Sequence, residues 1–93
     1  MPDLKVDVSE LRSQMGRARV SQLRLAELAD VHRNTIGKVL RNETADLETV
    51  AALTYGINIA LKEQGEAQLG PFDLLKPVGF PSPQVDAQAL STA

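Results

Sequence analysis

Apolar residues recur at helical spacing along the first half of the chain and predict two amphipathic helices there. The first helix starts at Val8 or Ser9, with Asp7 or Ser9 as its N-cap, and ends near Gly16. Its apolar stripe has the spacing i, i+4, i+7 and consists of Leu11, Met15 and Ala18. The second helix follows Ser21, whose hydroxyl suits an N-cap. Its inner face consists of Leu25, Ala26, Leu28 and Ala29. Each segment therefore buries one face.

A third helix is predicted over residues 32–41, and its two faces differ in chemistry. Ile36, Val39 and Leu40 point one way at i, i+3, i+4. The other face is polar, donor-rich or small, and consists of Arg33, Asn34, Gly37, Lys38 and Arg41. Only residues 30–32 separate this helix from the second one. Val31 is the apolar residue in this break, so we expect it to pack beneath both helices.

The pattern changes after a fourth helix, which Asp46 caps and Gly56 is expected to end. Ile57, Ile59 and Leu61 alternate with polar or small residues, which favours a strand. Residues 65–75 would supply a return strand after a turn, and residues 4–8 would join the sheet. A fifth helix after Gly56 is the alternative. The predicted fold class is therefore mainly α, a four- to five-helix bundle, with short β-strands at the N-terminus and after the fourth helix as an option.

Composition and charge narrow the class of protein. The chain has 93 residues, is 43% hydrophobic and contains no Cys, so we expect one small folded domain without disulfides or thiolate metal sites. The formal net charge is −2, yet residues 12–41 carry seven Lys or Arg side chains and only two acidic ones. Because local potential governs docking more than total charge does, this block favours an anionic partner. The alternative interpretation is that these basic residues only form a solvated helical surface.

Residues 21–42, SQLRLAELADVHRNTIGKVLRN, resemble the helix-turn-helix of the lambda-repressor/Cro (XRE-type) family of DNA-binding proteins. The resemblance lies in Ser21-Gln22 at the start of the second helix, the small Ala26, and the apolar Val31 and Ile36. It continues through the following loop and residues 46–59, and it covers residues 11–59 in all. Two positions depart from the family pattern: Asp30 stands where Gly usually begins the turn, and His32 where Ser usually caps the next helix. Asp tolerates the left-handed backbone better than most residues do, so we expect the turn to form.

The resemblance implies a third helix that enters the major groove of DNA. Its expected base contacts are Arg33, Asn34 and Lys38. The expected contacts to the DNA backbone are Gln22, Thr35, Arg41, Asn42, Arg19 and Arg24. Such a protein would be a transcriptional regulator. The resemblance leads us to expect a repressor that binds a palindromic operator as a homodimer.

Two alternatives remain at this stage. The first is an antitoxin that binds operator DNA and holds a toxin through its acidic C-terminal region. The second is a helical protein-interaction module without DNA binding. We expect no enzymatic activity, because Ser9, Ser82 and Ser91 have no evident base beside them. We also expect no cofactor, because the sequence shows no glycine loop for phosphates, and no metal site, because His32 is the only His.

The expected organisation has four parts. Residues 1–7 form an N-terminal arm or strand, and residues 8–59 form the helix-turn-helix domain. Residues 60–76 are a C-terminal extension and a candidate dimerisation element. Residues 77–93, with Pro77, Pro81 and Pro83, are expected to be a flexible tail. No apolar run is long enough to span a bilayer and the N-terminus does not resemble a signal peptide, so we expect a cytoplasmic protein without a membrane contact.

Overall fold

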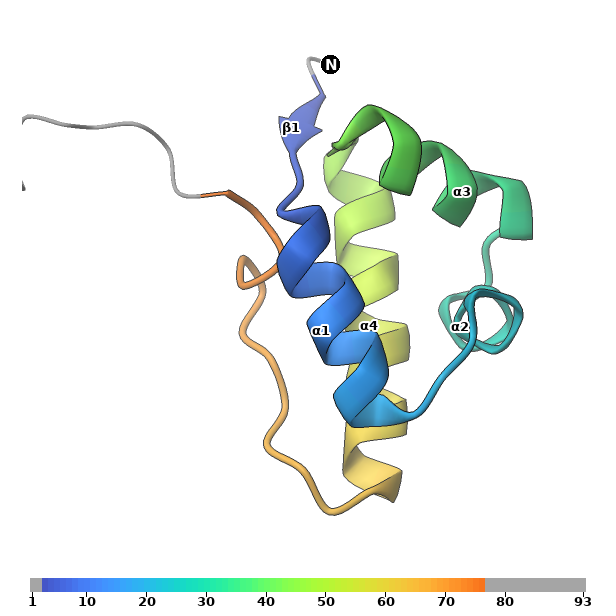
Figure 1. The fold of residues 1–93 in the computed structure, drawn as a ribbon, viewed down its shortest axis with the longest axis vertical. Coiled ribbons are helices and arrows are strands. Elements are labelled where there is room, and N and C mark those ends of the chain that lie inside the picture. Colours follow the sequence, from blue (N-terminus) through green and yellow to red (C-terminus); the bar gives the residue numbers. More distant parts are fainter. Residues whose placement is uncertain (1–2, 77–93) are drawn as a thin grey trace, which may run out of the picture.

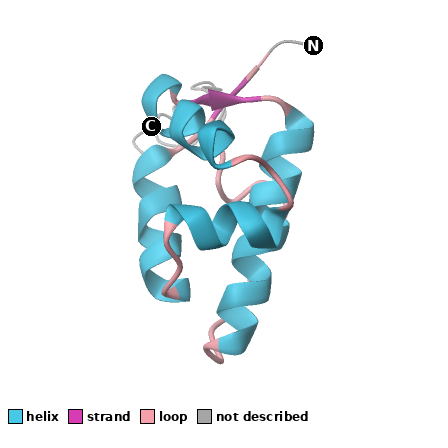
Figure 2. Cartoon of the chain, turned by 90° about the vertical axis from the view of Figure 1, so that its right-hand side faces the viewer, coloured by secondary structure: helices cyan, strands magenta, loops and turns pink. Residues whose placement is uncertain are grey.

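A computed structural model of the chain describes residues 3–76, and it is mainly helical (Figure 1). Its elements in chain order are β1 (Leu4–Lys5), α1 (Val8–Ala18), α2 (Gln22–Ala29), α3 (Arg33–Asn42), β2 (Thr44–Ala45) and α4 (Leu47–Glu63). In Figure 2 the short α2 lies across the two longer helices α1 and α4, and the strands lie at one end of the molecule. The predicted mainly α bundle is therefore confirmed, with four helices in the described part of the chain.

Side-chain caps fix where three of the helices begin. Asp7 caps α1, because its Oδ1 accepts a hydrogen bond of 3.0 Å from the Glu10 N–H. Ser21 caps α2 through its Oγ, and Asp46 caps α4 by accepting a 2.8 Å hydrogen bond from the Thr49 N–H. Asp7 is the observed choice between Asp7 and Ser9, and the predicted caps at Ser21 and Asp46 are confirmed. Local sequence thus sets the start of each of these helices.

The core lies where α4 packs against α1 and α2. Its fully buried side chains are aliphatic, because the chain has few aromatic residues: Val6, Leu11, Leu25, Ile36, Val50, Leu53, Ile57, Leu61 and Leu74. Burying a Leu or Ile side chain stabilises the folded state by about 1.5–3 kcal/mol, so this set is the main source of stability. The core includes residues from β1 to Leu74, which makes the described chain one packed unit.

The two strands pair with each other in a small antiparallel sheet. Leu4 lies opposite Ala45, and Lys5 lies opposite Thr44. Beyond the strand, the Val6 N–H donates to the Glu43 carbonyl at 2.9 Å, and Val6 is only 1% exposed. The N-terminal segment is therefore a strand that joins the core, which resolves the choice between arm and strand for residues 3–7.

The predicted strand after Gly56 is wrong, because α4 continues as one helix to Glu63. Ile57, Ala60 and Leu61 are all buried, with the spacing i, i+3, i+4 of an inward helix face. The alternation of Ile57, Ile59 and Leu61 that favoured a strand is a coincidence, since Ile59 is only half-buried. Gly56 does not end the helix but lies inside it, packed against α2.

Residues 64–76 return along the bundle without forming the predicted return strand. The Asn58 side chain anchors this segment by two hydrogen bonds, donating to the Leu69 carbonyl at 3.0 Å and accepting from the Leu69 N–H at 2.6 Å. Farther on, Leu75 forms a single antiparallel bridge with Val6, and Leu74 is 1% exposed. A fifth helix does not occur within residues 3–76.

The boundary expected at residue 59 falls inside α4, so residues 60–76 share the core of the preceding helices. The tail expected over residues 77–93 lies outside the described residues. Within residues 3–76, no helix combines the length and apolar character needed to cross a bilayer.

Candidate nucleic-acid interface

The turn between α2 and α3 holds the two helices close together. Asp30 ends α2 with φ of 57°, which is the left-handed conformation expected at this position. The Val31 N–H then donates to the Ala26 carbonyl at 3.0 Å, and the half-buried Val31 side chain packs against the core. Val31 therefore packs against the core, as expected of the apolar residue in the turn, and Asp30 adopts the left-handed conformation of the turn.

His32 begins α3 as its N-cap. Its Nδ1 accepts a hydrogen bond of 3.1 Å from the Asn34 N–H, so the imidazole caps the helix as a Ser hydroxyl would. This hydrogen bond requires a lone pair on Nδ1. The positive end of the helix dipole lies at this start of α3 and favours an anion nearby.

The inner face of α3 anchors the helix and leaves its opposite face to solvent. Ile36 and Val39 are 0% and 3% exposed. By contrast, the polar side chains predicted to contact DNA lie on the surface, and they include Arg33, Asn34, Lys38, Arg41 and Asn42, all exposed, with Thr35 half-buried. The division of α3 into two faces is therefore confirmed.

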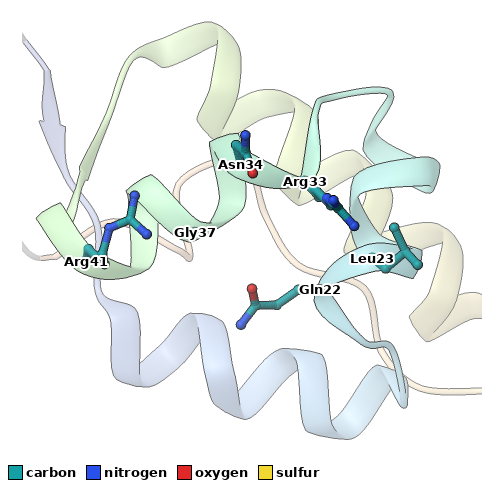
Figure 3. Close-up of a pocket in the computed structure, with 6 residues that line it drawn as sticks. All are labelled: Gln22, Leu23, Arg33, Asn34, Gly37 and Arg41. Carbon is teal, nitrogen blue, oxygen red and sulfur yellow. The ribbon is translucent and has the colours of Figure 1, made fainter.

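A hollow of about 360 Å³ lies between the start of α2 and the outer face of α3 (Figure 3). Its lining residues are Gln22, Leu23, Arg33, Asn34, Gly37 and Arg41. In Figure 3 the amide of Gln22 extends from α2 into this space, beneath α3. Four of the nine residues predicted to contact DNA are thus brought to one concave surface.

The remaining five predicted residues do not line this hollow. Lys38 is exposed on α3 one turn after Asn34, and Thr35 and Asn42 also belong to α3. Arg24 is exposed on α2, while Arg19 ends α1 in the left-handed conformation with φ of 54°. The structure therefore separates a central group around the hollow from a peripheral group.

Gly37 leaves the floor of the hollow open. Its backbone is ordinary helix, and a Cβ built there would meet only the Arg41 guanidinium, at 3.7 Å. Gly in a helix interior costs roughly 1 kcal/mol relative to Ala, and neither packing nor backbone conformation here requires it. The structural effect of an Ala at position 37 would therefore be to fill part of the open space in the hollow.

The charges of the surface are mostly free to interact with a ligand. Within residues 3–76, Arg33, Lys38 and Arg41 form no ion pair. Arg17 belongs to the same basic segment, but its guanidinium lies 3.2 Å from a Glu66 carboxylate oxygen. Arg17 also donates to the Gln14 side chain at 2.7 Å, so its guanidinium is already occupied by contacts within the protein. In the described part of the chain, the unpaired cations of this segment are therefore Arg33, Lys38 and Arg41 on α3, together with Arg12, Arg19 and Arg24.

Leu23 is a member of this surface that the sequence interpretation missed. It is 56% exposed and lines the hollow beside Arg33. A signal existed, because Leu23 is absent from the inner face of α2 that the periodicity defines, and a large apolar residue off that face needs another explanation.

The described residues offer no evident metal site, since no group of three or more His, Cys, Asp or Glu side chains gathers in residues 3–76. A comparison of the chain with protein-family models, curated proteins and solved structures finds no match.

Proposed function

We propose that the chain binds double-stranded DNA through the outer face of α3 and acts as a transcriptional regulator. The observation that carries this proposal is the cationic face of α3. Arg33, Lys38 and Arg41 are exposed and, in the described part of the chain, unpaired, while Ile36 and Val39 anchor the opposite face. A rigidly held helix with such a face matches what the major groove of B-DNA admits.

The side chains divide into two kinds of contact. Arg33 and Asn34 lie at the start of α3, where a guanidinium can bind guanine O6 and N7 and an amide can bind adenine N6 and N7. Gln22 and Arg41 also line the hollow, and their side chains suit phosphate oxygens. Phosphate contacts position the protein, and base contacts select the sequence.

One recognition helix covers few base pairs, so specific binding needs two copies on two half-sites about 34 Å apart. The proposed operator is therefore palindromic. A dimer on such an operator would exclude polymerase from an overlapping promoter, which makes repression the proposed sign of regulation.

The test starts from a random pool of duplex DNA, from which the sequences bound by the full chain are selected. A shared, symmetric sequence is expected, and its binding should weaken steeply with salt. On that sequence Arg33→Ala should cost about 1–3 kcal/mol and relax selectivity at one position. Arg41→Ala should weaken binding to all sequences alike and lower the slope of log K against log salt by about 1.

Arg17→Ala is the matched control, because it removes the same charge from a residue already paired with Glu66. It should leave selectivity unchanged. Failure to enrich any sequence, together with salt-independent binding to random duplex, would overturn the proposal.

A further inference from the structure

The outer face of α4 carries an apolar surface that the fold leaves uncovered. Tyr55 and Phe72 are 65% and 63% exposed, and Leu47 is 49% exposed. These three side chains border a groove of about 530 Å³, which is also lined by Ala51, Leu69 and Pro71 and by the polar Thr54 and Asn58. Large apolar side chains gathered at one place usually mark a contact surface, whereas single ones need no explanation.

Charged residues stand at the two ends of this face of α4. Glu48, Ala51, Tyr55, Asn58 and Lys62 follow one another at intervals of three or four residues, so they lie along one side of the helix. Glu48 is in the first turn and Lys62 in the last, and both are exposed. This side of α4 is therefore acidic at one end and basic at the other, with Ala51 and Tyr55 exposed between them and the Asn58 amide bonded to Leu69.

A helix face with this order of charges complements a second copy of itself. If two α4 helices pack antiparallel about a two-fold axis near Tyr55, Glu48 of each copy lies opposite Lys62 of the other. An isologous contact of this kind repeats every interaction twice, so two ion pairs flank the apolar centre. Ala51 is small and lets the two backbones approach, and the antiparallel arrangement also opposes the two helix dipoles.

The exposed aromatic side chains supply about a third of the area that a standard contact buries. A buried Tyr or Phe side chain contributes about 150–250 Å², so Tyr55 and Phe72 at their observed exposure would contribute about 500 Å² over two copies. A standard interface buries about 1,600 Å² in total, and Leu47 with the walls of the groove supplies part of the remainder.

We infer that the occupant of this surface is a second copy of the chain, held by antiparallel α4 helices with Tyr55 near the axis and Glu48–Lys62 pairs at both ends. This assignment moves the dimer contact from residues 60–76 as a whole to the outer side of α4 and residues 69–72. It locates the contact between the two copies that the proposed function requires, but it does not depend on DNA binding, because association is measurable without DNA.

The test is sedimentation equilibrium of the full chain in low salt without DNA. The wild-type chain should be dimeric at micromolar concentration, and Tyr55→Glu should raise the dimer dissociation constant at least tenfold by placing two carboxylates at the axis. Leu23→Glu is the matched control, since it introduces the same charge at another exposed apolar residue, on α2. It should leave the dimer intact.

A charge exchange tests the orientation and remains informative if Tyr55→Glu fails to fold. Glu48→Lys and Lys62→Glu should each raise the dissociation constant about tenfold, because each places like charges opposite one another. The double exchange should restore it to within about threefold of the wild-type value. A monomeric wild-type chain, an unaffected Tyr55→Glu dimer or a double exchange no better than the single ones would overturn the inference. Loss of DNA binding in an intact dimer would instead overturn only the proposed function.

Discussion

Gly56 in the middle of α4 packs against the backbone of Ala29 at the end of α2. A Cβ built on Gly56 would lie 3.0 Å from the Ala29 nitrogen and 3.0 Å from the Leu25 Cδ1. Real Cβ atoms rarely come so close to backbone, which cannot move aside as a flexible side chain can. The absence of a side chain at Gly56 therefore sets how closely α2, and with it the turn to α3, approaches α4.

Gly56→Ala should destabilise the protein even though Ala favours helix. We expect the free energy of unfolding to fall by about 1–3 kcal/mol, the usual cost of adding a methyl group to a packed contact, as measured by urea denaturation. Gly16→Ala is the matched control, because Gly16 also lies inside a helix and a Cβ there meets nothing within 4 Å. It should stabilise the fold by up to about 1 kcal/mol. An equal gain from both substitutions would contradict the close contact.

The error over Gly56 shows where sequence reasoning reached its limit. The caps at Ser21 and Asp46 and the two faces of α3 depend on residues a few positions apart, and these were predicted correctly. A Gly that ends a helix and a Gly that admits a neighbouring helix look the same in one sequence. The difference depends on Ala29, which is distant in the chain.

The small sheet and the exposed surface of α2 could not be predicted from the sequence for similar reasons. β2 has only two residues, Thr44–Ala45, too few for a period, and its partner lies near the N-terminus. Leu23 was visible as an apolar residue outside the inner face of α2, but only the folded arrangement places it beside Arg33. The sequence therefore predicted which faces of the helices are buried, but not which surfaces meet across the hollow.

His32 should contribute to stability through its cap on α3. His32→Ala removes the Nδ1 acceptor of the Asn34 N–H, and we expect a loss of about 1 kcal/mol in the free energy of unfolding. His32→Ser supplies a hydroxyl to the same N–H and should retain most of the stability. Thermal unfolding of the three proteins at one pH checks this order. A Ser variant as unstable as the Ala variant would mean that the imidazole acts by a contact other than the cap.

Asp46 should make stability depend on pH in the acid range. Hydrogen bonds from Thr49, from its side chain first and then from its backbone N–H, lower the pKa of Asp46 from its ordinary value of 3.8. The folded state thus favours the carboxylate, so the stabilisation is complete well above pH 3.8 and is lost as the pH falls through the lowered pKa. Asp46→Asn keeps a capping oxygen but cannot ionise in this range.

Urea denaturation of wild type and Asp46→Asn at about pH 6 and about pH 2.5 measures this effect. The wild-type protein should be the more stable of the two at the higher pH, with help from the helix dipole, and the difference should shrink at the lower pH. Parallel pH profiles would exclude a contribution from the ionisation of Asp46.

Gly37 separates the requirements of folding from those of binding. Gly37→Ala should raise the free energy of unfolding by about 0.5–1 kcal/mol, because a Cβ there meets only the Arg41 guanidinium at 3.7 Å and Ala is the better helix former. The same methyl group narrows the hollow between Gln22, Leu23 and α3, so affinity for the selected DNA should fall. Unfolding in urea and fluorescence anisotropy with labelled duplex measure the two effects on one preparation.

Because Gly16→Ala stabilises a helix away from the hollow, it should leave the affinity unchanged. A Gly37→Ala protein that is more stable and binds DNA as tightly as wild type would show that the hollow takes no part in recognition, and would restrict the contact to the exposed side chains along α3.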